Sequence, residues 1–117
     1  MAGVTRRKMT TDGLGRLGIA RQRFEEMVEE ATVDCYNESE QLTGWFTMID
    51  ENLVVPFETT VLGVAVTVVR VDQDRDEQIV AVCRRGRDRQ SLPLLDLPLP
   101  ELPPAGAEWI EAYRLWL

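Results

Sequence analysis

The sequence of 117 residues contains no histidine and only two cysteines. The cysteines, Cys35 and Cys83, stand far apart, so the paired spacing of zinc sites and of haem attachment is absent. Without histidine, a common general base and the usual nitrogen ligand of metals are also missing. We therefore expect two free thiols, as in the reducing cytoplasm, and neither zinc nor haem.

Long apolar runs and catalytic motifs are absent as well. No stretch reaches the ~20 apolar residues of a membrane span, and none follows the basic start of the chain. There is no P-loop and no nucleophile elbow. The pattern Gly-x-Gly-x-x-Gly at 13–18 follows a polar segment rather than a strand, so it does not indicate a dinucleotide site. We expect a cytoplasmic protein that is not an enzyme and has no membrane partner.

Positive charge is scarce in one part of the chain. The net charge is −7, and residues 24–60 hold ten acidic side chains and no basic one. The start of the chain is basic and lacks periodicity, so we interpret 1–13 as a flexible basic tail and 14–117 as a single domain. An acidic surface repels the phosphates of nucleic acid and attracts cations or a basic protein. We therefore expect no nucleic-acid partner.

The first half of the domain is predicted to be helical. Apolar residues recur at helical spacing from Leu14 to Ala31, which predicts a first helix. A second helix is predicted to begin at an Asn37 cap and to end before Pro56. Gly44 lies inside the second helix, where glycine lowers helix stability, so a close backbone contact is expected there.

The second half is predicted to be mostly β-structure. β-branched residues dominate 61–71 and 78–83, which predicts two strands, and a turn at 86–88 predicts a short third strand over 89–95. Five of the six prolines fall within 93–104, which predicts an extended strap over the surface. A last helix is predicted over 107–117. The expected fold class is α+β, an antiparallel sheet packed with an N-terminal helix pair and a C-terminal helix.

The acidic segment is the strongest functional signal. Asp34, Glu38 and Glu40 are predicted to crowd the turn between the first two helices. If those helices are antiparallel, Asp50 and Glu51 return toward the start of the first one. Calcium takes about six to eight oxygen ligands, so such carboxylates suit it. A solvated acidic face would show the same composition, and composition alone favours that interpretation over a calcium site.

Two further charged stretches each allow two interpretations. Asp72, Asp74 and Asp76 have the spacing of the first EF-hand ligands, but the glycine and the final glutamate of that loop are missing. They form either a solvated turn, which we favour, or a second, weak calcium site. The arginine-rich segment 84–89 either neutralises the acidic half of the protein, which we favour, or docks a phosphate.

A set of motifs runs in order through the chain: VDCYNESEQ at 33–41, GW at 44–45, DENLVVPF at 50–57, SLPL at 91–94 and IEAYRLW at 110–116. Together they resemble the cyanobacterial calcium-binding protein family, CcbP-like. The resemblance implies helices beside a small antiparallel SH3-like β-barrel or sheet, and calcium held by surface carboxylates rather than by an EF-hand. It implies Asp34 as the best-matched metal ligand, with Glu38, Glu40, Asp50 and Glu51 around it.

The predicted function is therefore binding of calcium ions by the acidic helical segment of a bacterial, cytoplasmic calcium buffer or sensor. Ser39 and Ala112 stand where relatives commonly have carboxylates, and fewer ligands would weaken binding. The alternative is a protein-interaction module of the same fold that has lost strong calcium binding and docks a basic protein. A third hypothesis, a metal-dependent hydrolase, requires a concave pocket that holds at least two of the acids.

Overall fold

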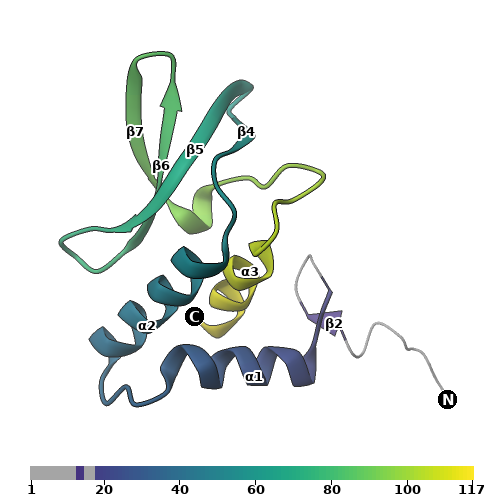
Figure 1. Ribbon diagram of the computed structural model, residues 1–117, viewed down its shortest axis with the longest axis vertical. Coiled ribbons are helices and arrows are strands. Elements are labelled where there is room, and N and C mark those ends of the chain that lie inside the picture. The colour runs from purple at the N-terminus through teal and green to yellow at the C-terminus, as the bar shows by residue number, and fades with distance from the viewer. Residues whose placement is uncertain (1–12, 15–17) are drawn as a thin grey trace, which may run out of the picture.

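The computed structural model describes residues 13–14 and 18–117, so most of the predicted tail lies outside the described residues. Three helices, α1 (Arg21–Thr32), α2 (Glu38–Asn52) and α3 (Ala107–Trp116), lie together below a sheet (Figure 1). The sheet consists of β4 (Phe57–Val61), β5 (Val64–Gln73), β6 (Ile79–Arg85) and β7 (Asp88–Pro93), paired antiparallel in that order. The predicted α+β class is confirmed. The SH3-like barrel is not confirmed, because β4 and β7 both remain edge strands and the sheet does not close.

The first helix begins later than the sequence pattern predicts. β2 (Gly13–Leu14) pairs antiparallel with β3 (Ile19–Ala20), and α1 starts only at Arg21. Between the two short strands, Gly18 has a φ of 65°, a left-handed conformation that glycine adopts readily and a helix cannot use. The prediction of a helix from Leu14 is therefore wrong at its start, although its second half forms as expected.

The contact between α1 and α2 depends on a glycine. Asn37 caps α2 as predicted, because its Oδ1 accepts a hydrogen bond from the backbone N–H of Glu40 at 2.9 Å. Further along α2, a Cβ added to Gly44 would lie 1.9 Å from the carbonyl oxygen of Ala31 on α1. The close backbone contact predicted at Gly44 is thus confirmed.

Trp45 lies in the core where the three helices meet. It is fully buried, and its ring centroid lies 6.2, 5.9 and 5.6 Å from those of Trp109, Tyr113 and Trp116 on α3. Aromatic pairs at these distances stabilise a core beyond the area they bury. The same core continues to the sheet through Val68. Because Trp45 belongs to α2, it anchors the acidic segment to the hydrophobic core.

The sheet has one strand more than the sequence predicts. Where a single strand was expected over 61–71, the chain turns at Leu62 and Gly63 between β4 and β5. Both turn residues have positive φ values, 49° and 78°, as in a two-residue hairpin. Leucine is unusual at such a position, so the residue types did not indicate the turn.

The proline-rich strap runs beside β4 and returns to the helices, as Figure 1 shows. It starts with a single 3-10 turn, η2 (Leu94–Asp96), and then has no regular structure up to α3, as predicted. The Thr59 hydroxyl of β4 donates to the carbonyl oxygen of Pro98 at 2.5 Å. The N–H of Val54 donates to the carbonyl oxygen of Ala105 at 2.9 Å, which fixes the end of α2 beside the start of α3.

Candidate metal site

The five predicted metal ligands lie on α2 or on the loop before it, and all five are exposed. Asp34 is in the loop, Glu38 and Glu40 are in the first turn of α2, and Asp50 and Glu51 are near its end. Glu40 and Asp50 are ten positions apart, about 15 Å along a helix that rises ~1.5 Å per residue. Since calcium–oxygen distances are about 2.3–2.6 Å, one ion cannot join both ends. We call Asp34, Glu38 and Glu40 the loop group, and Asp50 and Glu51 the helix-end group.

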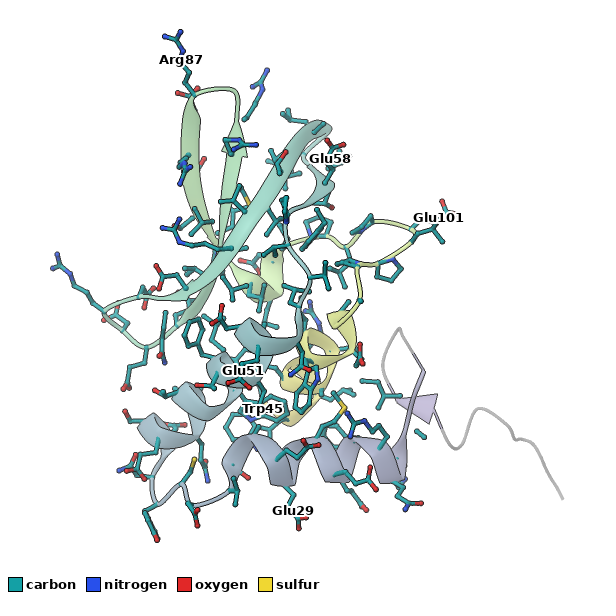
Figure 2. The ribbon with its side chains drawn as sticks, viewed as in Figure 1. Glu29, Trp45, Glu51, Glu58, Arg87 and Glu101 are labelled. Carbon is teal, nitrogen blue, oxygen red and sulfur yellow. The ribbon has the colours of Figure 1, made fainter. Side chains whose placement is uncertain are left out.

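The helix-end group lies beside the start of α3. α2 rises away from α1 toward the sheet, and Figure 2 shows Glu51 on the upper part of α2 and Glu29 on the underside of α1. The backbone next to the group touches α3, since a Cβ added to Gly106 would lie 2.0 Å from the carbonyl oxygen of Asn52. In the first turn of α1, Cζ of Arg23 lies 5.7 Å from the ring centroid of Trp109, so the start of α1 and the end of α2 both meet the first turn of α3.

Local hydrogen bonds account for part of the loop group. The Glu40 carboxylate accepts a hydrogen bond from the N–H of Tyr36 at 2.6 Å, which closes the loop. Glu38 and Glu40 also lie at the N-terminal end of α2, where the helix dipole favours negative charge. Asp34 has a φ of 59°, and its carboxylate has no hydrogen bond or ion pair to any other described residue. Of the three side chains, that of Asp34 has the least evident structural role.

The tip of the β5–β6 hairpin brings another carboxylate beside the loop group. The Ser39 hydroxyl donates a hydrogen bond to the carboxylate of Glu77. One turn later, the Thr43 hydroxyl lies 3.4 Å from Oε1 of Gln73. These contacts join residues 38 and 30 positions apart in the sequence, so no local pattern could have predicted them. Glu77 is thus a candidate site residue that sequence reasoning missed.

The three alternating aspartates of that hairpin shape the turn. Oδ1 of Asp74 accepts hydrogen bonds from the N–H groups of Asp76 and Gln78, both at 2.9 Å. Oδ1 of Asp72 accepts one from the N–H of Gln73 at 2.9 Å. Aspartate bonds of this kind to nearby backbone are typical of turns. These hydrogen bonds support the interpretation that Asp72 and Asp74 stabilise a solvated turn.

The helix-end group lacks such an explanation. The last turn of α2 contains no basic side chain, so Asp50 and Glu51 lie near the partial negative charge of the C-terminal carbonyls. Each such placement costs roughly 0.3–1 kcal/mol at an exposed site. On α1 an arginine offsets part of the repulsion between acidic side chains. Nη1 of Arg23 lies 3.7 Å from Oε1 of Glu26 and 3.2 Å from Oε1 of Glu30. No comparable ion pair relieves Asp50 or Glu51 within the described residues.

The carboxylates stand apart from one another in this conformation. Within residues 13–14 and 18–117, no three His, Cys, Asp or Glu side chains are close enough together to hold a metal ion. A calcium ion shared by the loop group therefore requires its exposed side chains to turn toward each other. Four hollows along the sheet, the strap and α3 are lined by none of the five predicted ligands. These four hollows therefore give no support to the hydrolase hypothesis.

The arginine-rich segment 84–89 does not neutralise the acidic half. It lies at the β6–β7 end of the sheet, and Figure 2 shows Arg87 at the tip, far from Glu29 and Glu51 on the helices. The ion pairs among the described residues involve Arg23 and Arg114 instead. Our favoured interpretation of this segment is therefore wrong, because the sheet carries it away from α1 and α2.

Comparisons with known proteins agree on one family. A family model for CcbP-type proteins, described as calcium binding, matches residues 25–117. The crystal structure of Anabaena CcbP is 19% identical, with a TM-score of 0.69 over 88% of this chain and 94% of that one. A calcium binding protein in the calcium-binding form is also 19% identical, with a TM-score of 0.66 over 81% of this chain and 89% of that one. No curated protein sequence matches.

These findings confirm the resemblance predicted from the motifs, and they support calcium as the ion. At 19% identity the two solved structures show a shared fold. The matched family is a calcium-binding family rather than an enzyme family. None of the helices described here is long and apolar enough to cross a membrane. Because the family model spans most of the sequence, the chain belongs to the CcbP calcium-binding family.

Proposed function

We propose that the chain binds calcium through exposed carboxylates of its acidic helical segment, as an intracellular calcium buffer or sensor without an EF-hand. The observation that carries this proposal is the segment 24–60, with ten acids and no base, within a member of a calcium-binding family. Asp34 is the main ligand, supported by Glu38 and Glu40, and Asp50 and Glu51 hold a second, separate ion. The hairpin carboxylate of Glu77 lies next to the first group.

The electrostatics of the helix ends support both proposed calcium positions, one at Asp34 and one at Asp50 and Glu51. Asp34 follows the carbonyl end of α1, where the partial negative charge of the last peptide groups favours a cation. Asp50 and Glu51 lie at the carbonyl end of α2, where the same effect operates. Bound calcium would offset the repulsion that these carboxylates otherwise meet. The carbonyl end of a helix is therefore unfavourable for a solvated carboxylate but favourable for a carboxylate that binds a cation.

Isothermal calorimetry in buffer with excess magnesium tests the proposal directly. The wild type should release or absorb heat with calcium, and the double variant Asp34→Asn, Glu38→Gln should bind at least about tenfold more weakly. The matched control is Glu101→Gln, Glu108→Gln, which removes the same charge from exposed positions on the strap and α3. Absence of calcium heat at millimolar concentration, or equal affinities of the two double variants, would contradict the proposed site.

A buffer and a sensor differ in whether calcium changes an apolar surface. Val33 and Tyr36 flank the loop group and are 63% and 88% exposed, respectively. In a sensor, calcium should shift the NMR signals of both side chains and alter the binding of an apolar dye. In a buffer, the shifts should stay confined to the carboxylate groups and their amides.

A second candidate function is a calcium-independent module that docks a basic protein on its acidic face. The observation that favours it is the lack, within the described residues, of three acids grouped closely enough for a metal. A lysine-rich peptide should then bind in the presence of a chelator, and binding should weaken as salt rises. Asp34→Asn, Glu38→Gln should weaken peptide binding, whereas calorimetry with calcium should show no heat.

A further inference from the structure

The two edges of the sheet differ in their protection. The strap accompanies β4, and the Thr59 hydroxyl bonds to Pro98 across that boundary. On β7, residues 88–91 are exposed, and they form no backbone hydrogen bond outside the strand pairing within the described chain. An uncovered edge strand presents unpaired N–H and C=O groups that another strand can join. β7 is therefore the edge open to strand addition.

The exposed edge carries a net positive charge. Segment 84–89 contains four arginines and one aspartate, in a chain whose net charge is −7. None of these arginines forms an ion pair with any described residue. Arg84 and Arg89 are directly opposite each other across β6 and β7, an arrangement that costs stability. An anionic group bound beside them would relieve that repulsion.

A hollow lies at the same end of these strands. It measures about 270 Å³. Its apolar lining comes from Val61, Val64, Val66, Cys83 and Leu92, and its polar lining from Arg84, Arg85, Asp88, Arg89 and Gln90. The helices cover the other end of the sheet and leave this end uncovered (Figure 1). Side chains of a strand alternate between faces, so a guest beside β7 would place one set near Arg89 and the other over the apolar lining of the hollow.

We propose that the edge of β7 docks an extended segment of a partner protein in which acidic and apolar residues alternate. The guest would extend the sheet through backbone hydrogen bonds, and its carboxylates would meet Arg84 and Arg89 while its apolar side chains fill the hollow. Pairing of two β7 strands from two copies of this chain would bring like-charged arginine clusters together, so a second copy is disfavoured. The inference does not rest on calcium binding.

The test uses a capped synthetic peptide of about seven residues in which valine and glutamate alternate, titrated into the full chain with a chelator present. NMR should show intermolecular backbone contacts between the peptide and residues 88–92. Arg89→Glu should weaken binding about tenfold or more. The matched control Arg75→Glu makes the same charge change at the exposed tip of the β5–β6 hairpin and should alter affinity by less than about twofold.

Specific outcomes would overturn the inference. One is no peptide binding by a folded wild type at millimolar peptide. Another is equal weakening by Arg89→Glu and Arg75→Glu, which would indicate an unspecific charge effect. Equally strong binding of a peptide with lysine in place of glutamate, or of single-stranded DNA, would show that the chemistry assigned to the partner is wrong. Circular dichroism of each variant confirms that a loss of binding does not reflect unfolding.

Discussion

Gly44 of α2 and Ala31 of α1 are in backbone contact, with the Ala31 carbonyl oxygen 1.9 Å from where a Cβ on Gly44 would lie. Gly44→Ala should therefore destabilise the protein by about 1–3 kcal/mol, because the added methyl group forces the two helices apart. Helix propensity alone predicts a gain of about 1 kcal/mol for the same change. Urea unfolding of the variant and the wild type shows whether the substitution lowers or raises the free energy of unfolding.

The control for that variant is Thr47→Ala, at an exposed position of the same helix. Its effect should stay within about 0.5 kcal/mol. A Gly44→Ala protein more stable than wild type would show that α1 and α2 do not pack as closely as described.

Calcium should raise the thermal unfolding midpoint through the loop group. A ligand at about one hundred times its Kd adds about 2.7 kcal/mol of stability. Asp34→Asn should lose most of the increase, yet match the wild type in chelator, because asparagine also tolerates the positive φ of 59° found there. Differential scanning calorimetry with and without calcium measures both effects. A full calcium-dependent increase in the variant would exclude Asp34 as the main ligand.

Opposite charge effects are expected at the two ends of α2. In chelator, Glu51→Lys should stabilise the protein by roughly 0.3–1 kcal/mol, because it places positive charge at the carbonyl end of the helix. Glu38→Lys should destabilise it by a similar amount, because the N-terminal end favours negative charge. Urea unfolding compares the two variants, and effects of the same sign would disprove this explanation.

Alkaline pH should destabilise the fold through two buried groups. Burial raises the pKa of the Cys83 thiol and the pKa of the Tyr113 hydroxyl above their ordinary values. Both groups then hold their protons more tightly in the folded state, so this stability is present below their unfolded pKa values, about 8.5 and 10. It is lost as pH rises through those values toward the raised folded ones.

Unfolding midpoints measured from pH 7 to pH 11 should show this decline. Cys83→Ala should flatten the first part of the pH dependence. A midpoint that rises across the same range would mean that the thiol is not buried in its neutral form. The matched readout is thiol labelling, in which half-buried Cys35 should react before Cys83.

Local signals predicted the helical half of the fold well. The Asn37 cap, the contact at Gly44 and the aromatic helix α3 each follow from neighbouring residue types. The turn at Leu62 was missed because its conformation is unusual for leucine and is imposed by the pairing of β4 with β5.

The candidate site was harder to predict, because it depends on how elements pack. The five candidate ligands were chosen by residue type and by the family resemblance, but their division into two groups follows from the length of α2. The approach of Glu77 to Ser39 depends on where the β5–β6 hairpin lies relative to α2, and no pattern of either segment encodes that position. Segment 84–89 was likewise misread because charge composition carries no information about distance.

The separation of those arginines from the acidic helices gives the described part of the molecule an electric dipole. In the field of a charged surface such a molecule rotates before it makes contact, so that its helices approach a basic partner first and its β6–β7 turn an acidic one. Calcium bound at the helices would shrink this dipole and leave the arginine end unchanged. The ion would then alter how the protein is oriented during an encounter, even at a contact surface far from where it binds.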